Sequence, residues 1–127
     1  MKKISFCLLF VFIFFLLQGI EARTNSKQTK KEIKYKVTFI ELGSVNCIPC
    51  KMMQPIMKEI ETEYKDQVKV IFYDVRTKED SKRAMEYKIR VIPTQVFLDS
   101  EGKEYFRHMG FFPKEELVKV LKQKGVK

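Results

Sequence analysis

Apolar side chains in this chain follow two different spacings, which alternate along its length. Mostly apolar runs at 35–42 and 68–74 have the β-branched and aromatic composition of buried strands. Between them, apolar side chains recur every three or four residues, as on one face of a helix. The members of this predicted stripe are Met52, Met53, Ile56, Met57, Ile60 and Tyr64. The pattern predicts a strand, a helix and a second, parallel strand.

The next segment predicts another helix and then a hairpin. Thr77 and Asp80 have the spacing of a capping box, with Asp in place of the usual Glu or Gln, for a helix that ends at about Tyr87. Two short runs, 95–98 and 104–109, flank a group of turn-forming residues and predict antiparallel strands. Together with the parallel pair they predict a mixed sheet.

A last amphipathic segment ends the chain. Pro113 suits the first position of a helix and Gly125 its end, and the apolar side chains between them are expected to face inward. These side chains are Leu117, Val118, Val120 and Leu121. The predicted fold class is therefore α/β, with a central mixed β-sheet flanked by helices.

The front of the chain has the pattern of a secretory signal. Lys2 and Lys3 precede an almost wholly apolar run over 4–17, and Ala22 offers a small residue at a cleavage position. This run is shorter than the ~20 apolar residues that a membrane-spanning helix needs. We therefore expect a cleaved signal peptide, with an uncleaved membrane anchor as the alternative.

The expected domain organisation has three parts. Residues 1–22 form the signal peptide or anchor, residues 23–34 a polar tether rich in Lys, Thr and Gln, and residues 35–127 one folded domain. Export would place this domain in the periplasm or outside the cell, where disulfides can persist.

The chain carries a formal net charge of +9, from 25 Lys and Arg against 16 Asp and Glu. Because the two signs are interleaved in every segment, we expect a solvated surface, with weak attraction to an anionic membrane as the alternative. No nucleic-acid-binding motif accompanies the charges, and no nucleic-acid partner is expected. No long apolar stripe remains once the core is assigned, so the expected state is a monomer.

Cysteine usage narrows the chemistry. The chain has three cysteines, of which Cys7 lies inside the predicted signal. The remaining pair, Cys47 and Cys50, is too small for a disulfide scaffold. A structural zinc site needs four ligands, and His108 is the single histidine. Neither a metal nor a bound cofactor is therefore expected, and the expected redox group is the Cys47–Cys50 pair.

Cys47 and Cys50 are separated by Ile48 and Pro49, directly before the first predicted helix. At a helix N-terminus, unpaired backbone N–H groups and the helix dipole stabilise a thiolate, which is the form that attacks disulfides. Cys47 is therefore the expected nucleophile. Cys50, one turn into the helix, is placed to attack a mixed disulfide at Cys47 and to release the substrate.

These elements and motifs resemble the thioredoxin superfamily from about Val37 to Lys124. The resemblance rests on the Cys-x-Pro-Cys motif and on further positions along the chain. These positions are Lys51, Pro55, Ile92-Pro93-Thr94 and Gly110. The resemblance implies an exported thioredoxin-like thiol-disulfide oxidoreductase that acts on protein thiols and disulfides.

The resemblance also implies where substrate binds. Pro93 is expected to follow a cis peptide bond beside the cysteines, with an ordinary proline at the start of a strand as the alternative. The backbone of Ile92 is expected to contact an extended substrate. The other expected substrate contacts are Asn46, Ile48 and Pro49.

The chain departs from the family pattern in three ways. Asn46 stands where a tryptophan usually precedes the first cysteine, so the rim of the site is more polar. Glu41 stands where thioredoxins carry a buried Asp; a carboxyl group in an apolar strand has a raised pKa and can take the proton from Cys50. The alternative for Glu41 is an outward-facing strand residue. The stretch before Val37 is shorter than the family's opening strand and helix, so a trimmed N-terminal unit is expected.

The residues between the cysteines predict the direction of electron flow. Ile48 and Pro49 provide neither a charge nor a hydrogen-bond donor, whereas oxidases of the DsbA type have a histidine there. A reducing or electron-relaying role is therefore favoured, with electrons drawn from a membrane donor as in exported thioredoxin-like reductants. Two alternatives stay open: an oxidase or isomerase of secreted proteins, and a non-enzymatic binding module with a structural disulfide.

Overall fold

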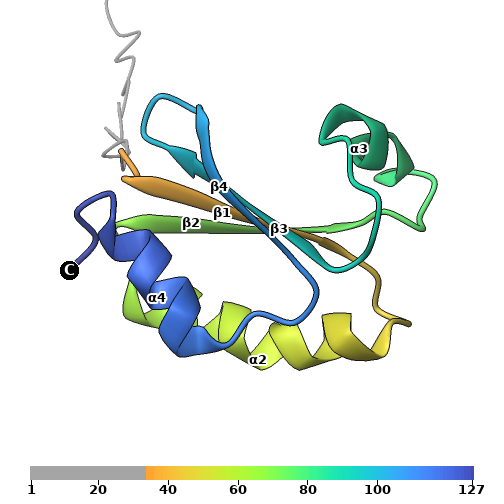
Figure 1. Ribbon diagram of the computed structural model, residues 1–127, viewed down its shortest axis with the longest axis horizontal. Helices are drawn as coiled ribbons and strands as arrows, with labels where there is room; N and C mark the ends of the chain where they lie inside the picture. Colours follow the sequence, from red (N-terminus) through yellow and green to blue (C-terminus); the bar gives the residue numbers. More distant parts are fainter. Residues whose placement is uncertain (1–33) are drawn as a thin grey trace, which may run out of the picture. The chain divides into compact units, whose positions relative to one another are not determined.

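The computed structural model describes residues 34–127, which contain four strands and three helices (Figure 1). In chain order these are β1 (Val37–Gly43), α2 (Ile48–Glu63), β2 (Val68–Asp74), α3 (Ser81–Glu86), β3 (Thr94–Asp99), β4 (Glu104–Met109) and α4 (Lys114–Lys122). The expected signal peptide, and all but the last residue of the expected tether, lie outside the described residues.

The strands form one mixed sheet in the order β2-β1-β3-β4, which confirms the predicted architecture. β1 runs parallel to β2 and antiparallel to β3, and β3 and β4 pair as an antiparallel hairpin. Figure 1 shows α2 and α4 on one face of the sheet and α3 on the other. The chain between β1 and β2 passes through α2, and this crossover is what allows the two strands to run parallel.

β1 lies inside the sheet, between β2 and β3, and it is buried on both faces because helices cover both faces of the sheet. Val37 and Phe39 belong to the larger hydrophobic cluster, which includes residues of α2 and α4. Ile40 and Leu42 belong to the smaller cluster, on the face that α3 covers. Since side chains alternate along a strand, the odd-numbered residues of β1 face α2.

Aromatic rings fill the larger cluster. Phe39 and Phe97 are fully buried and stack with their ring centroids 5.0 Å apart. Phe97 also meets Phe106 and Phe112 edge-on, with centroid distances of 5.8 Å and 6.2 Å. Phe97 therefore joins β1, β4 and the segment before α4 into one core.

Helix α2 buries a narrower face than its apolar spacing predicts. Met53, Met57 and Ile60 are buried, whereas Met52 is 50% exposed, so its predicted inward position is wrong. The reason is that position 52 lies about 100° around the helix from position 53 and falls beside the buried face. Pro55 lies inside the helix without ending it.

Helix α3 begins later than its capping-box spacing predicts. The Oγ1 of Thr77 accepts a hydrogen bond from Asp80 N at 3.2 Å and donates to the Asp74 carbonyl at 2.9 Å. However, the side chain of Asp80 makes no capping bond, and the helix begins only at Ser81. The hydrogen bonds of Thr77 instead close a turn that precedes the helix.

Helix α4 agrees with the prediction to within one residue. Pro113 is its N-cap rather than its first helical residue, and Gly125 follows its end with a φ of +74°. Of the side chains predicted to face inward, Val118 is half-buried and three are buried: Leu117, Val120 and Leu121.

We expect Phe97→Ala to lower the free energy of unfolding by about 3–5 kcal/mol, because it removes a fully buried ring and leaves a cavity in the larger cluster. Urea denaturation followed by circular dichroism measures this change. The matched control is Met85→Ala on α3, where the side chain is 77% exposed and the expected change is below about 0.5 kcal/mol. A loss below about 1 kcal/mol for Phe97→Ala would contradict the assigned core.

Candidate functional site

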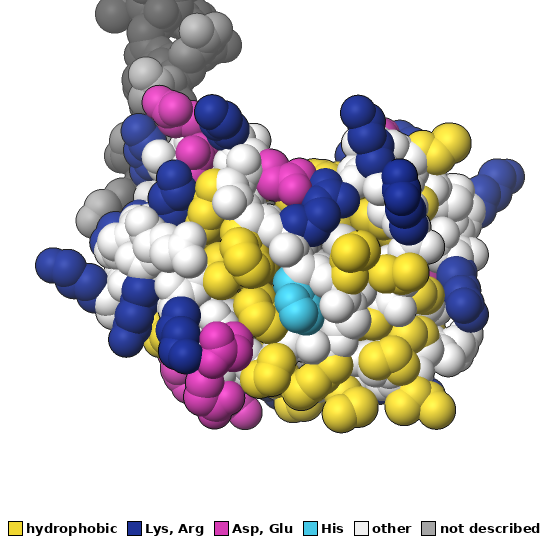
Figure 2. Space-filling model, viewed as in Figure 1, with side chains coloured by type: hydrophobic (Ala, Val, Ile, Leu, Met, Phe, Trp, Pro, Cys, Tyr) yellow, Lys and Arg dark blue, Asp and Glu magenta, His cyan; other side chains and the backbone are white. Residues whose placement is uncertain are grey.

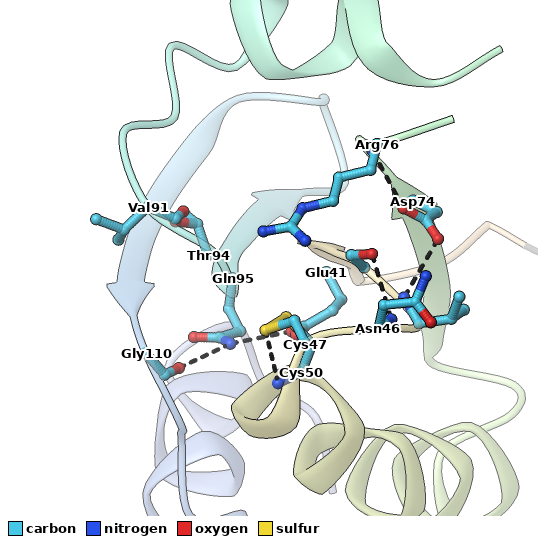
Figure 3. Close-up of a disulfide and its surroundings, with 12 residues drawn as sticks. Glu41, Asn46, Cys47, Cys50, Asp74, Arg76, Val91, Thr94, Gln95 and Gly110 are labelled. Carbon is cyan, nitrogen blue, oxygen red and sulfur yellow. Dashed lines mark hydrogen bonds between the residues drawn. A yellow bond between two sulfur atoms is a disulfide. The ribbon is translucent and has the colours of Figure 1, made fainter. Parts of the chain in front are cut away.

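Cys47 and Cys50 form a disulfide where the chain passes from β1 into the first turn of α2 (Figure 3). Cys47 is the N-cap of α2: its backbone is extended, and its Sγ accepts a hydrogen bond from Cys50 N at 3.3 Å. A sulfur in this position lies at the free N–H groups and the positive end of the helix dipole. The same groups stabilise a thiolate after the disulfide is reduced.

The two cysteines differ in their access to solvent. Cys50 is fully buried, whereas Cys47 is partly exposed. Cys50 lies against the backbone of β1, since a Cβ at Gly43 would lie 3.2 Å from Cys50 Sγ and 3.3 Å from Cys50 Cβ. The absence of a side chain at Gly43 therefore lets the helix approach the strand closely. Of the pair, Cys47 is the cysteine that a protein substrate can reach.

Side-chain hydrogen bonds hold the loop between β1 and α2. Asp74, the last residue of β2, accepts a hydrogen bond from Val45 N at 3.2 Å, and Ser44 Oγ accepts one from Asn46 N at 3.3 Å. Asn46 is exposed directly before the first cysteine. These bonds set the path by which β1 delivers the cysteines to the helix.

The segment before β3 reaches the same edge of the sheet. Thr94 pairs with Leu42 near the end of β1, and the peptide bond between Ile92 and Pro93 is cis. Thr94 Oγ1 donates a hydrogen bond to the Val91 carbonyl at 2.8 Å. Pro93 is buried and Ile92 is half-buried. The cis bond therefore lies at the edge where β1 continues toward the disulfide.

Glu41 is a fully buried carboxylic acid. It lies two residues before Gly43, so both residues occupy the face of β1 that contacts Cys50. Burial raises the pKa of Glu41 to about 8, and a hydrogen bond from Gln95 Nε2 to Glu41 Oε2 at 3.0 Å opposes this rise. The side chain is therefore buried rather than outward-facing, and its ionisation lies near neutral pH.

Gln95 is a buried member of the site that the sequence patterns did not predict. It lies opposite Glu41 in the β1–β3 register, and its Nε2 also donates a hydrogen bond to the Gly110 carbonyl at 3.0 Å. The available signal was a polar residue in an apolar strand, directly after the Ile-Pro-Thr motif.

Several apolar side chains are exposed near the disulfide. Val45 and Ile48 flank Asn46 and the first cysteine and are 54% and 75% exposed. Val91 precedes the cis bond and is 49% exposed, and Met109, opposite the first residue of β3, is 60% exposed. Figure 2 shows apolar side chains gathered over the amino-terminal end of α2. The rim of the disulfide therefore combines polar and apolar surface.

Two further properties concern residues 34–127 alone. No group of three or more His, Cys, Asp or Glu side chains in this range could hold a metal ion. No helix in the range is both long enough and apolar enough to cross a bilayer.

A family model described as a thioredoxin-like domain matches residues 22–125, which include the sheet, its helices and the Cys47–Cys50 pair. The chain belongs to the thioredoxin-like family. The match also includes residues 22–33, which lie outside the described part of the structure.

Curated relatives agree with membership of this thioredoxin-like family. The chain is 33% identical over 101 residues to a thioredoxin of Mycoplasmopsis pulmonis, a match that covers 76% of this chain and 92% of the relative. It is 38% identical over 76 residues to a thioredoxin of Mycoplasmoides gallisepticum, covering 60% of this chain and 72% of the relative. The solved exposed lipoprotein thioredoxin of Streptococcus pneumoniae shares the fold, with a TM-score of 0.62 at 24% identity over 72% of this chain and 87% of that one.

This thioredoxin-like protein is therefore a thiol-disulfide oxidoreductase that acts on protein disulfides. Thioredoxins need no cofactor, because the reacting group is the cysteine pair of the chain itself.

The raised pKa of Glu41 predicts that stability falls as pH rises. Between the ordinary pKa of 4.5 and the folded value of about 8, the folded protein holds a proton that the unfolded chain has lost. In the oxidised protein, Glu41 is therefore expected to lower the free energy of unfolding as the pH rises between these two pKa values. The slope is at most about 1.4 kcal/mol per pH unit. Urea denaturation at several pH values from about 5 to about 8 measures the slope.

Glu41→Gln removes the titrating group and is expected to flatten this slope. The matched control, Glu101→Gln at an exposed position, is expected to keep it. An unchanged slope in Glu41→Gln would show that Glu41 does not titrate in this range.

Proposed function

We propose that this thioredoxin-like protein works outside the cytoplasm and reduces protein disulfides, or relays electrons to them, through Cys47 and Cys50. The observation that carries the proposal is the asymmetry of the pair. Cys47 caps α2 and is partly exposed, whereas Cys50 is fully buried. One sulfur can therefore meet a substrate while the other reacts within the protein.

Cys47 is the nucleophile in this mechanism. In the reduced protein its thiolate attacks one sulfur of a substrate disulfide, and the other substrate sulfur leaves as a thiolate. The N–H groups at the start of α2, including that of Cys50, support the thiolate form of Cys47. The product is a mixed disulfide between Cys47 and the substrate.

Cys50 resolves the mixed disulfide. Its thiol gives its proton to the Glu41 carboxylate, and the resulting thiolate attacks Cys47 Sγ. The bond between the two protein sulfurs forms, and the bond from Cys47 to the substrate breaks, so the substrate leaves as a thiolate. The substrate gains two electrons and the cysteine pair loses two. The contact of Cys50 with Gly43, on the face of β1 that carries Glu41, supports this role for the carboxyl group.

The proposed substrate contacts surround the disulfide. Asn46 and Ile48 are exposed, and Pro49 and Ile92 are half-buried, so all four offer surface to an extended segment of a substrate. The backbone of Ile92 is the proposed partner for the substrate backbone. Pro93 is buried, and its proposed contribution is to support the loop rather than to offer surface.

The reducing direction is proposed from the residues between the cysteines. Ile48 is 75% exposed and Pro49 is half-buried, and neither side chain adds a charge or a donor near the Cys47 thiolate. Strongly oxidising cysteine pairs have a stabilised reduced form. The lack of a charge or hydrogen-bond donor between Cys47 and Cys50 therefore favours a lower reduction potential. A reductant outside the cytoplasm needs electrons delivered across the membrane, so a membrane thiol donor is the proposed partner.

The extracytoplasmic location is proposed from the signal-like segment at residues 1–22. Cleavage after Ala22 would release the domain, and an uncleaved segment would tether it to the membrane. The domain itself is proposed to act as a monomer.

A pair of variants tests the roles of the cysteines. Cys50→Ala is expected to accumulate mixed disulfides with substrates, because the resolving thiol is absent and Cys47 remains. Cys47→Ala is the matched control and is expected to trap none. Non-reducing electrophoresis with mass spectrometry of the linked proteins measures the difference. Equal trapping by the two variants would contradict the assignment of Cys47 as the nucleophile.

The equilibrium reduction potential of the Cys47–Cys50 pair tests the direction of electron flow. We expect a value near that of thioredoxin, about −270 mV, in redox buffers of known composition. A value near about −120 mV would instead indicate a disulfide oxidase. A separate assay of disulfide reduction uses the double variant Cys47→Ser, Cys50→Ser, which is expected to lose turnover; retained turnover would contradict the assignment of the reaction to these two cysteines.

A further inference from the structure

Gln95 connects three parts of the site by hydrogen bonds. Its Nε2 donates to Glu41 Oε2 on β1 and to the Gly110 carbonyl after β4, each at 3.0 Å. Gly110 N donates in turn to the Pro93 carbonyl at 2.8 Å. Gln95 and Glu41 are both fully buried, and Figure 3 shows the amide between the carboxyl group and Gly110. The amide therefore joins the buried acid to the loop that contains the cis bond.

The two partners of Nε2 define the orientation of the Gln95 amide. The Gly110 carbonyl can only accept, and Glu41 Oε2 also accepts, so both face the nitrogen with its two hydrogens. Turning the amide over would set its oxygen against the Gly110 carbonyl, which has no hydrogen to donate. Gly110 has a φ of +89°, a backbone conformation that glycine adopts readily and other residues rarely do. The carbonyl of Gly110 therefore holds the Gln95 amide by a hydrogen bond on the side opposite Glu41.

The amide also distinguishes the two oxygens of Glu41. Oε2 accepts from Gln95 whether the carboxyl group is charged or neutral, whereas Oε1 has no hydrogen-bond partner among the described residues. Oε1 is therefore the oxygen of Glu41 that is free to take up or release a proton. Gly43, which contacts Cys50, lies roughly 7 Å further along the same face of β1.

We propose that Gln95 is the positioning residue of Glu41, because it holds Oε2 and leaves Oε1 to exchange a proton with Cys50. This inference rests on the proposed function, in which Glu41 accepts that proton. Gln95 acts through Glu41 and takes no part in the proton transfer itself.

The hydrogen bond from Gln95 also favours the carboxylate form. Burial raises the pKa of Glu41 to about 8, and the bond from Gln95 acts in the opposite direction. Removal of the amide is therefore expected to raise the pKa of Glu41 further. At neutral pH a smaller fraction of Glu41 is then ionised, so proton removal from Cys50 is expected to become slower.

Other titratable and charged groups around Glu41 come from three elements of the fold. These groups are Cys47 and Cys50 at the start of α2, His108 opposite Gln95 on β4, Asp74 at the end of β2 and Arg76 just after it. In the oxidised protein the two cysteines do not titrate. A titration of the oxidised protein therefore removes the cysteines from the measurement, and a Glu41→Gln background identifies any effect of the other groups.

The first experiment compares the titration of Glu41 in the wild-type protein and in Gln95→Met. Methionine has a length close to that of glutamine and makes neither hydrogen bond. Carboxyl-carbon NMR of the oxidised protein follows Glu41, and its midpoint in Gln95→Met is expected to rise by about one pH unit, a tenfold change in the acid dissociation constant. Gln123→Met, at an exposed position, is the matched control and is expected to leave the midpoint unchanged.

The second experiment measures the proton-transfer step. The rate at which Cys50 resolves a preformed mixed disulfide at Cys47 is followed against pH. In Gln95→Met the midpoint of this pH profile is expected to move to higher pH by about one unit, as for the Glu41 titration. The rate at neutral pH is then expected to be about tenfold lower. In a Glu41→Gln background the same substitution is expected to leave the profile unchanged. A merely structural role for Gln95 would lower stability without moving the profile.

An unshifted midpoint or rate profile in Gln95→Met, or a shift that persists in the Glu41→Gln background, would overturn the proposal. If Gln95→Met does not fold, the wild-type protein provides the test. The NMR resonance of the Gln95 side-chain nitrogen is then expected to titrate with the midpoint of Glu41, and a resonance independent of pH would overturn the proposal. Failure of the proposed function itself is seen separately, as a lack of disulfide reduction by the wild-type protein.

Discussion

The burial of β1 on both faces is the constraint from which the geometry of the site follows. Helices cover both faces of the sheet, and side chains alternate along a strand, so the even-numbered side chains of β1 pack on the α3 face and its odd-numbered side chains on the α2 face. Phe39, Glu41 and Gly43 therefore form one line: a core ring, a buried acid and the contact point of Cys50. A shift of one residue in the register of β1 would turn this line to the other face and separate the acid from the disulfide.

A carboxyl group in such a position has opposite effects on stability and on chemistry. Burial of a charge in an apolar core is unfavourable, and Glu41 accommodates it by remaining protonated to about pH 8 and by accepting a hydrogen bond from Gln95. The same burial brings its ionisation close to neutral pH, where a carboxyl group can both accept and return a proton. The hydrogen bond from Gln95 moderates the effect of burial, and the backbone of Gly110 holds Gln95 in place.

β2 was predictable from its mostly apolar run, and β4 from its place after the turn-forming residues 99–102. β2 and β4 lie at Val68–Asp74 and Glu104–Met109, as the sequence pattern predicted. Helical spacing located α2 correctly but overestimated the width of its buried face, because the contact with the sheet determines how far around the helix side chains are covered; Met52 lies beyond that contact. In α3, a short helix, the hydrogen bonds of Thr77 closed a turn instead of the first helical turn.

The cysteine pair could be recognised from neighbouring residues alone. Cys47 and Cys50 precede a helix, and the free N–H groups at a helix start are a local property of the backbone. The environment of Glu41 is not local, because Gln95 is 54 residues away in the sequence and meets Glu41 through the β1–β3 register. That register depends on the packing of the whole sheet. A polar residue in a strand can face water or the core, and the sequence near Glu41 left both open until the packing of α2 against β1 covered its face.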